Sequence, residues 1–292
     1  MTFDYALTRR TCSRPASRPA RGGRGRRVAP AVTSLYGGVA STPLGANSCE
    51  SVVNTFVLVH SPLVGPLTWS RVAEELRHRG IEALTPALPQ DDDAAGPFWE
   101  RHAGAIAQTL RALPADRSVI LAGHSGAGPI LPAIRREADR SVAAYLFVDA
   151  GLPENGQPRL GSGDFARQLR ELYARGERFP NWGDELLRTV VPDPSVRRAL
   201  LAELRPQPWA FWAEPIPVFA GWPDAPCAYL RFAPNPAYDD AAAEARRRGW
   251  PCLELAGGHF HMLVDADAVT GALVEVVRRM RDDHSAAVDP PR

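Results

Sequence analysis

Residues 118–128 read Ser-Val-Ile-Leu-Ala-Gly-His-Ser-Gly-Ala-Gly, an apolar run that ends in a turn of small residues. The run is typical of a buried β-strand, and a turn of this kind, the nucleophile elbow, lifts a serine hydroxyl out of the end of a sheet. The motif departs from Gly-x-Ser-x-Gly because Ala127 stands at its last position, with Gly126 and Gly128 on either side. Ser125 is therefore the first candidate nucleophile, although a glycine-rich strand-to-helix turn with a capping serine shares this pattern.

Outward from this stretch, short apolar runs alternate with segments of helical periodicity. Continuous hydrophobicity indicates strands that are buried on both faces, as in a parallel sheet covered by helices. The runs predicted to be strands are 55–60, 81–85, 118–122, 143–149, 227–232 and 252–255. Helical spacing predicts one helix through Trp69, Val72 and Leu76 and a last helix over 269–280. We expect an α/β protein with a mostly parallel sheet of about six strands and helices on both faces.

The segment between Gly151 and Pro226 breaks this alternation. It contains no convincing strand, three weak helical stretches and several tryptophans. Because a structureless loop of that length is improbable in a compact domain, we expect 152–225 to be a helical cap inserted over the strand ends, where ligands of open α/β sheets bind. Trp209 and Trp212 then either line the ligand or pack within the cap. The core comprises 48–151 and 226–284.

The charge distribution separates a basic tail from an acidic body. All 34 basic residues are arginine, and the absence of lysine excludes Schiff-base and P-loop chemistry. Residues 1–30 carry a net charge of +7, which leaves −6 for the rest of a chain of net charge +1. An acidic body argues against nucleic acid or an anionic membrane as the main partner. Residues 1–47, rich in Arg, Pro and Gly, and the C-terminal 285–292 are expected to be disordered.

The remaining composition excludes several other classes of protein. The four cysteines, at positions 12, 49, 227 and 252, lack the close paired spacing of zinc ribbons and redox motifs. No run of 18 uncharged apolar residues predicts a membrane span. We expect a cytoplasmic protein without a metal or organic cofactor, with an apolar small molecule as its substrate. The sequence is compatible with a homodimer.

A serine needs a base within hydrogen-bond distance to act as a nucleophile. His259 follows Gly257 and Gly258 directly after the last predicted strand, which places it at the carboxyl edge of the sheet beside the elbow. His261, two residues further on, is the competing candidate. The other histidines are expected to hold loop backbones (60 and 124) or to lie on exposed helix faces (78, 102 and 284).

Four segments carry a resemblance to a known family. They are Phe-Val-Leu-Val-His-Ser-Pro-Leu-Val-Gly-Pro-Leu-Thr-Trp at 56–69, Gly-His-Ser-Gly-Ala at 123–127, Phe-Val-Asp-Ala-Gly-Leu-Pro at 147–153 and Gly-Gly-His-Phe-His-Met-Leu at 257–263. With these segments, residues 54–283 resemble the α/β-hydrolase superfamily, in particular its small branch that includes plant methylesterases and hydroxynitrile lyases. The resemblance implies that Ser125 is the nucleophile, His259 the base and the Gly126 N–H one half of the oxyanion hole.

The triad acid is the first point at which the chain departs from that family. The family commonly places its acid in the loop after the strand 227–232, and the matching residue here is Asn235, whose amide has no charge to stabilise an imidazolium. Two carboxylates could take its place. Asp149 ends the strand 143–149 beside the elbow and preserves the chain order Ser, Asp, His, whereas Asp239 lies four residues past Asn235. Either one could instead only cap a loop.

The second departure concerns the oxyanion hole. Its second donor in the family is the N–H two residues after the histidine that ends the strand 55–60, and this position is Pro62, which has no N–H. Either the Leu63 N–H or the Ser61 hydroxyl takes over, or the site stabilises an oxyanion less well. Loss of one such donor is worth roughly 3 kcal/mol of transition-state stabilisation.

Three functions are compatible with these residues. The first expectation is hydrolysis of an ester, lactone or thioester of an apolar small molecule through an acyl-Ser125 intermediate. The second is a lyase, epoxide-opening or cyclisation reaction in which Asp149 and His259 move protons while Ser61 or Ser125 only holds the substrate. The third is a ligand receptor without turnover.

Deletion of residues 1–45 should leave the melting temperature and the activity nearly unchanged, because disordered termini make few native contacts. Thermal unfolding of the full and shortened chains measures this. A melting temperature lowered by more than about 4 °C, equivalent to at least ~1 kcal/mol, would show that the tail is docked on the folded body.

Overall fold

The computed structural model describes residues 54–90 and 94–288, with their side chains as far as Met280. Six strands form one sheet in the order β2-β1-β3-β4-β7-β8, and every neighbouring pair is parallel. The strands are β1 Asn54–Val59, β2 Ala83–Leu84, β3 Ser118–His124, β4 Ala144–Val148, β7 Cys227–Ala233 and β8 Cys252–Ala256. The predicted parallel sheet of six strands is confirmed, with an edge strand β2 that is shorter than expected.

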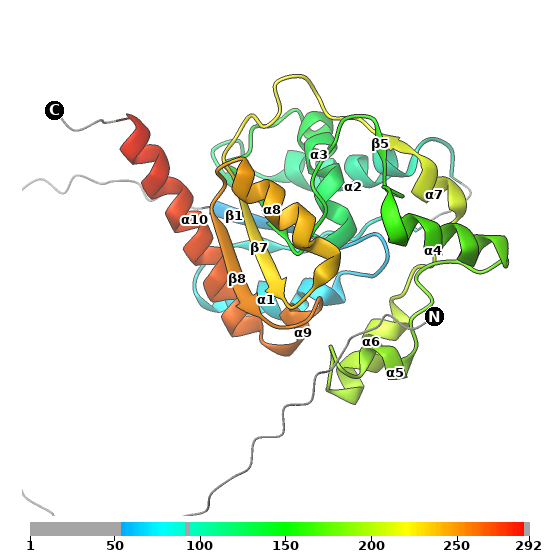
Figure 1. The fold of residues 1–292 in the computed structure, drawn as a ribbon. Helices are drawn as coiled ribbons and strands as arrows, with labels where there is room; N and C mark the ends of the chain where they lie inside the picture. Colours follow the sequence, from blue (N-terminus) through cyan, green and yellow to red (C-terminus); the bar gives the residue numbers. More distant parts are fainter. Residues whose placement is uncertain (1–53, 91–93, 289–292) are drawn as a thin grey trace, which may run out of the picture. The chain divides into compact units, whose positions relative to one another are not determined.

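Helices cover both faces of this sheet (Figure 1). The helices on one face are α1 Leu67–His78, α9 His261–Val264 and α10 Ala266–Val288, and those on the other are α2 Phe98–Ala112, α3 Leu131–Ala138 and α8 Asp239–Arg247. Within the described ranges, no helix is long and apolar enough to cross a bilayer.

The central strands have no polar face. In β1, Phe56 and Leu58 pack into the apolar cluster on one side of the sheet, while Val57 and Val59 pack into the cluster on the other. Successive side chains of a strand point to opposite faces, so a strand covered on both sides is apolar throughout. This double burial explains the continuous hydrophobicity of the sequence. Trp69 ties α1 to this layer by donating its Nε1–H to Val59 O at the end of β1, at 3.1 Å.

The inserted segment 152–225 contains four helices and a short antiparallel strand pair. The helices are α4 Gly163–Ala174, α5 Asp184–Leu187, α6 Pro194–Ala202 and α7 Trp209–Ala213, and the strands are β5 Gln157–Pro158 and β6 Pro215–Ile216. The sequence indicated three helical stretches and no strand. Two-residue strands are too short to show a period-two pattern, and α5 is a single turn. The hydrophobic pattern of the sequence therefore could not indicate either of them.

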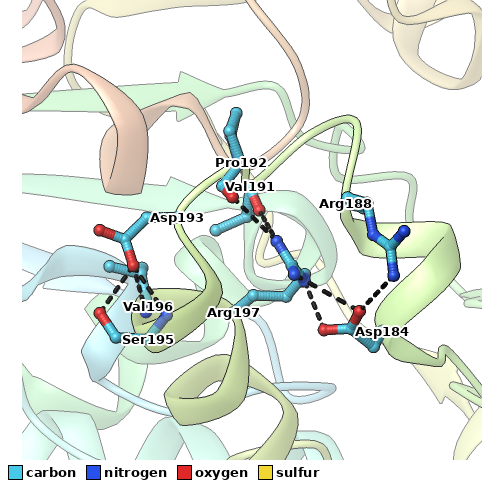
Figure 2. Close-up of polar contacts among 8 residues, drawn as sticks. All are labelled: Asp184, Arg188, Val191, Pro192, Asp193, Ser195, Val196 and Arg197. Atoms are coloured by element: carbon cyan, nitrogen blue, oxygen red, sulfur yellow. Dashed lines mark hydrogen bonds and ion pairs between the residues drawn. The ribbon is translucent and has the colours of Figure 1, made fainter.

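Side-chain caps and ion pairs hold the short helices α5 and α6. Asp193 caps α6 by accepting hydrogen bonds from Ser195 N at 2.7 Å and Val196 N at 3.1 Å (Figure 2). Pro194, the first residue of α6, lacks an N–H that would have no partner there in any case. The hydrogen bond from Ser195 lowers the pKa of the Asp193 carboxyl. These contacts define where the helix begins.

The buried Arg197 then joins α6 to α5. Its Nε donates to Asp184 Oδ1 at 2.5 Å, and its Nη1 donates to Val191 O at 2.8 Å (Figure 2). The hydrogen bond from Arg197, followed by that from Arg188, lowers the pKa of the Asp184 carboxyl. A guanidinium with several fixed donors can cross-link chain segments that have little apolar surface of their own.

Hydrogen bonds tie the inserted segment to loops at the carboxyl ends of the strands. Arg205 N donates to Leu63 O at 2.9 Å, and Gln207 Nε2 donates to Pro62 O at 2.8 Å, so residues after α6 are fixed to the loop that follows β1. Arg159, which follows β5, donates its Nη1–H to Gly126 O at 3.0 Å. The segment therefore contacts both the β1 loop and the turn after β3.

A buried ion pair lies behind this attachment. The Arg159 side chain is only 4% exposed, with its Nε 3.6 Å from Glu214 Oε1. Glu214 also accepts hydrogen bonds from Phe98 N at 2.7 Å and Trp99 N at 2.9 Å, at the first residues of α2. A carboxylate stabilises this helix end because its N–H groups have no partner within the helix.

Gly128 marks a close approach between the turn after β3 and the chain after β4. A Cβ atom on Gly128 would lie 2.1 Å from Gly151 O, a backbone atom. We expect Gly128→Ala to lower the free energy of unfolding by about 1–3 kcal/mol, because backbone segments would have to separate. Urea denaturation measures the change.

The matched control is Gly104→Ala within α2, where an added Cβ meets no heavy atom within 4 Å. This control should gain roughly 0.5–1 kcal/mol from the better helix propensity of alanine. Equal unfolding free energies for the Gly128 variant and the unaltered chain would contradict the close-packing interpretation.

Candidate active site

Ser125 stands at the first position after β3 in a left-handed conformation, with φ of 58°. Non-glycine residues adopt this region at a cost of about 1–2 kcal/mol, so the surrounding packing must hold the turn. A Cβ on Gly123 would lie 3.0 Å from Leu131 Cδ2. After Ser125, the position at which a side chain would collide with backbone is Gly128. The close approach therefore falls one residue after Ala127, which explains why the chain departs from Gly-x-Ser-x-Gly.

Asp149, directly after β4, is fully buried and also left-handed, with φ of 44°. Its Oδ2 lies 2.7 Å from His259 Nδ1, and its Oδ1 accepts a hydrogen bond from Phe232 N at 3.2 Å. A carboxylate facing Nδ1 holds the proton on that nitrogen and leaves the lone pair on Nε2. The tautomer of His259 is thus the one that a general base requires.

Asn235 supports this pair from the loop after β7. Its Nδ2 donates a hydrogen bond to Asp149 Oδ2 and lies 3.3 Å from His259 Nδ1. Asn235, which stands where the family commonly has its acid, thus contacts the carboxylate of Asp149. Tyr229 adds support from β7, since its hydroxyl donates to Ala150 O at 2.8 Å and accepts from Ala150 N at 3.1 Å.

Asp239 lies apart from this network. Its carboxylate forms an ion pair with Arg231 on the surface, and about half of its side chain is exposed. Among the hydrogen bonds of the described residues, none joins Asp239 to His259. Asp149 is the carboxylate that the structure brings to the imidazole.

Two buried histidines hold the backbone around the site, as expected. His124 Nε2 donates to His259 O at 2.9 Å, and the centroids of the two imidazole rings lie 4.4 Å apart. Burial lowers the pKa of His124 well below its usual value, so the His124 ring beside His259 carries no positive charge at neutral pH. His60 Nδ1 lies 2.8 Å from Ser61 O, and its Nε2 accepts from Leu88 N.

The expectation that His102 lies on an exposed helix face is wrong. His102 is 4% exposed and packs against Phe98 and Phe211, and burial lowers its pKa to about 3. This face of α2 is covered by the inserted segment, a contact that helical periodicity cannot indicate. His261 contacts the ring of Phe232, and among the hydrogen bonds and ring contacts of the described residues none joins its side chain to the elbow.

The loop after β1 brings Ser61 close to the elbow. A Cβ on Gly126 would lie 3.3 Å from Ser61 Oγ and 3.5 Å from Pro62 Cδ. Leu63 N donates to Ser61 Oγ at 3.3 Å, so this N–H already has a partner, whereas the proton of the Ser61 hydroxyl is still available to donate. Of the two donors considered for the position of Pro62, the serine hydroxyl lies nearer to Gly126.

Sequence reasoning missed Tyr238. Its hydroxyl lies 2.9 Å from Ser125 Oγ, and its ring stacks on that of His259 with centroids 5.2 Å apart and planes 15° apart. Among the hydrogen bonds of residues 54–90 and 94–288, none joins Ser125 to His259. Burial raises the pKa of the Tyr238 phenol. Its place in the sequence, three residues past Asn235 in a loop at the carboxyl edge, was the available signal.

A cavity of about 140 Å³ lies beside the loop after β1. Its lining includes both polar and apolar side chains, among them His60, Pro62, Phe98, His102, Arg205 and Gln207. Pro62 belongs to this cavity and also lies against Gly126.

Neither Trp209 nor Trp212 lines the cavity. Trp212 is buried in the apolar cluster of the inserted segment and donates its Nε1–H to Tyr173 OH at 2.8 Å. Trp209 is 39% exposed and packs against the ring of Tyr173. The observed contacts of both tryptophans are packing contacts within the inserted segment.

Comparison with known proteins gives consistent results. Putative methylesterases 14 and 12 of Arabidopsis thaliana, both described as chloroplastic, are each 26% identical to the chain over 146 and 145 residues. The match covers 45% of this chain and 42% of the length of each relative. The chain thus spans about two fifths of the curated relatives it matches.

Solved structures match over a larger share of the chain. An extracellular alpha/beta-hydrolase from a Paenibacillus species aligns with a TM-score of 0.62 at 20% identity, over 76% of this chain and 98% of its own. Tomato methylketone synthase I in complex with 2-tridecanone aligns with a TM-score of 0.60 at 15% identity, over 78% and 99%. A methylesterase from Arabidopsis aligns with a TM-score of 0.59 at 17% identity, over the same shares. At these identities the likeness shows the fold.

The sequence pattern of the alpha/beta hydrolase family matches residues 56–272, which include most of β1, the elbow, Asp149 and His259. This match covers most of the chain and agrees with the six-stranded parallel sheet and with the similarity to plant methylesterases. The chain belongs to the alpha/beta hydrolase family.

Proposed function

We propose that the protein is a serine esterase that cleaves an ester, lactone or thioester of a small molecule through a covalent acyl-Ser125 intermediate. The observation that carries the proposal is the 2.7 Å contact between the buried Asp149 carboxylate and His259 Nδ1, at the sheet edge where Ser125 occupies a left-handed turn. The similarity to plant methylesterases supports this reaction class.

The first step is attack by Ser125. Rotation about its Cα–Cβ bond turns Oγ from Tyr238 toward His259 Nε2, which removes the hydroxyl proton as Oγ attacks the carbonyl carbon. Asp149 keeps the ring in the required orientation and stabilises the imidazolium that forms. Catalytic hydrogen bonds are often long or misaligned without substrate, so the resting contact of Ser125 with Tyr238 is compatible with this step.

Negative charge then develops on the carbonyl oxygen. In the proposed oxyanion hole the Gly126 N–H donates one hydrogen bond and the Ser61 hydroxyl the other, replacing the N–H that Pro62 lacks. Each donor of this kind is worth about 3 kcal/mol when it is aimed at the developing charge. Water later attacks the acyl-enzyme with His259 as base, which releases the acid and restores Ser125.

We propose that the inserted segment 152–225 is a cap and that the cavity beside Pro62 receives part of the substrate. At about 140 Å³ the cavity has room for roughly four or five groups of the size of a water molecule, which favours a short acyl or alcohol group. Burial lowers the pKa of His60 to about 4 and that of His102 to about 3, so both imidazoles are neutral at pH 7. The neutral imidazoles and the apolar side chains of the lining are compatible with the carbon chain of a small ester, and Arg205 and Gln207 supply a polar side of the cavity.

Ser125→Ala should reduce kcat/KM for ester hydrolysis by more than ~10³-fold with little change in melting temperature, because removal of the nucleophile disables the triad as a unit. Hydrolysis of p-nitrophenyl acetate measures the rate. A fluorophosphonate probe followed by peptide mass spectrometry should modify Ser125 in the unaltered protein.

The same measurements discriminate the alternatives. If Ser125→Ala keeps more than about a tenth of the turnover on a substrate, covalent catalysis is excluded for it and the proton-transfer reaction by Asp149 and His259 takes its place. The hydrogen bond of Ser125 to Tyr238, and not to His259, is the feature that favours this second function. Binding without either labelling or turnover would indicate a receptor.

Asp149→Asn should lower kcat by about 10³- to 10⁴-fold, since an amide leaves His259 without a fixed tautomer or a countercharge. The matched control is Asp239→Asn, which removes a surface ion pair with Arg231 and should change kcat less than twofold. Both rates are measured on protein whose folding is checked by circular dichroism. Full activity of Asp149→Asn, or a large loss in the control, would assign the acid elsewhere.

A further inference from the structure

The esterase mechanism leaves Tyr238 without a role. It stands on the short 3₁₀ turn Pro236–Tyr238 between β7 and α8, and its hydroxyl is 2.9 Å from Ser125 Oγ. Its ring lies flat against His259, with 15° between the planes. The phenol thus touches both the atom that attacks and the ring that moves the proton.

The Tyr238 phenol is a neutral hydrogen-bond donor. Burial raises its pKa above the usual value near 10, so the hydroxyl keeps its proton at any pH at which an esterase works. A neutral phenol can donate to an oxygen on which negative charge develops, and side-chain hydroxyls of this kind are effective when fixed in advance. Stacking on His259 fixes the ring.

The position of the phenol selects which oxygen it contacts. In the tetrahedral intermediate, the carbonyl oxygen and the leaving oxygen are both bonded to the carbon that carries Ser125 Oγ, so a donor within reach of Oγ is close to both. The Gly126 N–H and Ser61 lie together on the elbow side, where a Gly126 Cβ would be 3.3 Å from Ser61 Oγ. Tyr238 lies on the side of His259, the group that protonates the leaving oxygen.

We propose that Tyr238 is a catalytic residue that donates a hydrogen bond to the leaving oxygen as the carbon–oxygen bond of the ester breaks. The inference rests on the proposed esterase function and adds to it the group that stabilises the departing alkoxide.

The step balances without any further reactant. The C–O bond of the tetrahedral intermediate breaks, its electron pair goes to the leaving oxygen, and the carbonyl of the acyl-Ser125 reforms. The proton on His259 Nε2, taken earlier from Ser125, passes to that oxygen to give the alcohol. Tyr238 keeps its own proton throughout and only donates a hydrogen bond while the charge is present.

The test compares two acetate esters that differ in the alcohol. Ethyl acetate releases a strongly basic alkoxide that needs help to depart, whereas p-nitrophenyl acetate releases a weakly basic phenolate that does not. For Tyr238→Phe, which keeps the stacking ring, we expect kcat/KM to fall about 10²-fold on ethyl acetate and less than about fivefold on p-nitrophenyl acetate. The ratio of the two losses is the readout.

The matched control is Ser61→Ala, which removes the hydroxyl beside Gly126. Because the carbonyl oxygen of both esters develops the same charge, this variant should lose similar factors on the two substrates. Comparable losses on both esters for Tyr238→Phe, or a gain on either, would overturn the proposal. A gain would show that the phenol restrains Ser125.

Labelling separates failure of this inference from failure of the esterase function. A fluorophosphonate expels fluoride, which needs no proton, so Tyr238→Phe should be modified at Ser125 nearly as fast as the unaltered protein. If only the variant resists labelling, Tyr238 maintains the structure of the site and the inference is wrong. If the unaltered protein also resists it, the covalent function fails, and the inference fails with it.

Discussion

The buried carboxylate of Asp149 is the interaction on which the geometry of the site depends. A negative charge without exposed surface must be matched by donors, because leaving one partner unpaired costs about 3–5 kcal/mol. The donors here come from three places, the Phe232 N–H in β7, the Asn235 amide in the following loop and His259 after β8. The loops after β7 and β8 are thereby held to the loop after β4 by one residue. The left-handed backbone at Asp149 and at Ser125 persists because the surrounding contacts hold it.

Much of the architecture could be predicted from local sequence pattern. Continuous apolar runs indicated strands covered on both faces, and the alternation with helical spacing indicated a parallel sheet, which the six strands and the family match confirm. Small residues around Ser125 and the two glycines before His259 placed both residues at the ends of strands, where the structure has them. Parallel strands end at one edge, so Asp149 was one of two candidate carboxylates, and its contact with His259 is what the structure adds.

The rest depends on contacts between segments that are far apart in sequence. His102 looked exposed because its own helix gives no sign of the residues of the inserted segment that cover it, and the tryptophans of that segment gave no sign of which partners they pack against. Tyr238 is a single tyrosine in a loop, and its approach to Ser125 depends on how that loop folds over β7. The role of Asn235 also depends on such a contact, because its amide can support a carboxylate only where the fold brings it to Asp149.

The hydroxyls of Ser61 and Tyr238 also bear on how such a site evolves. A backbone N–H is present whichever residue is encoded, proline excepted, so a donor of that kind is inherited with the fold. A side-chain hydroxyl exists only while the codon specifies serine, threonine or tyrosine. Pro62 offers no backbone N–H, so in the proposed mechanism a substitution of Ser61 or Tyr238 changes how the site stabilises charge.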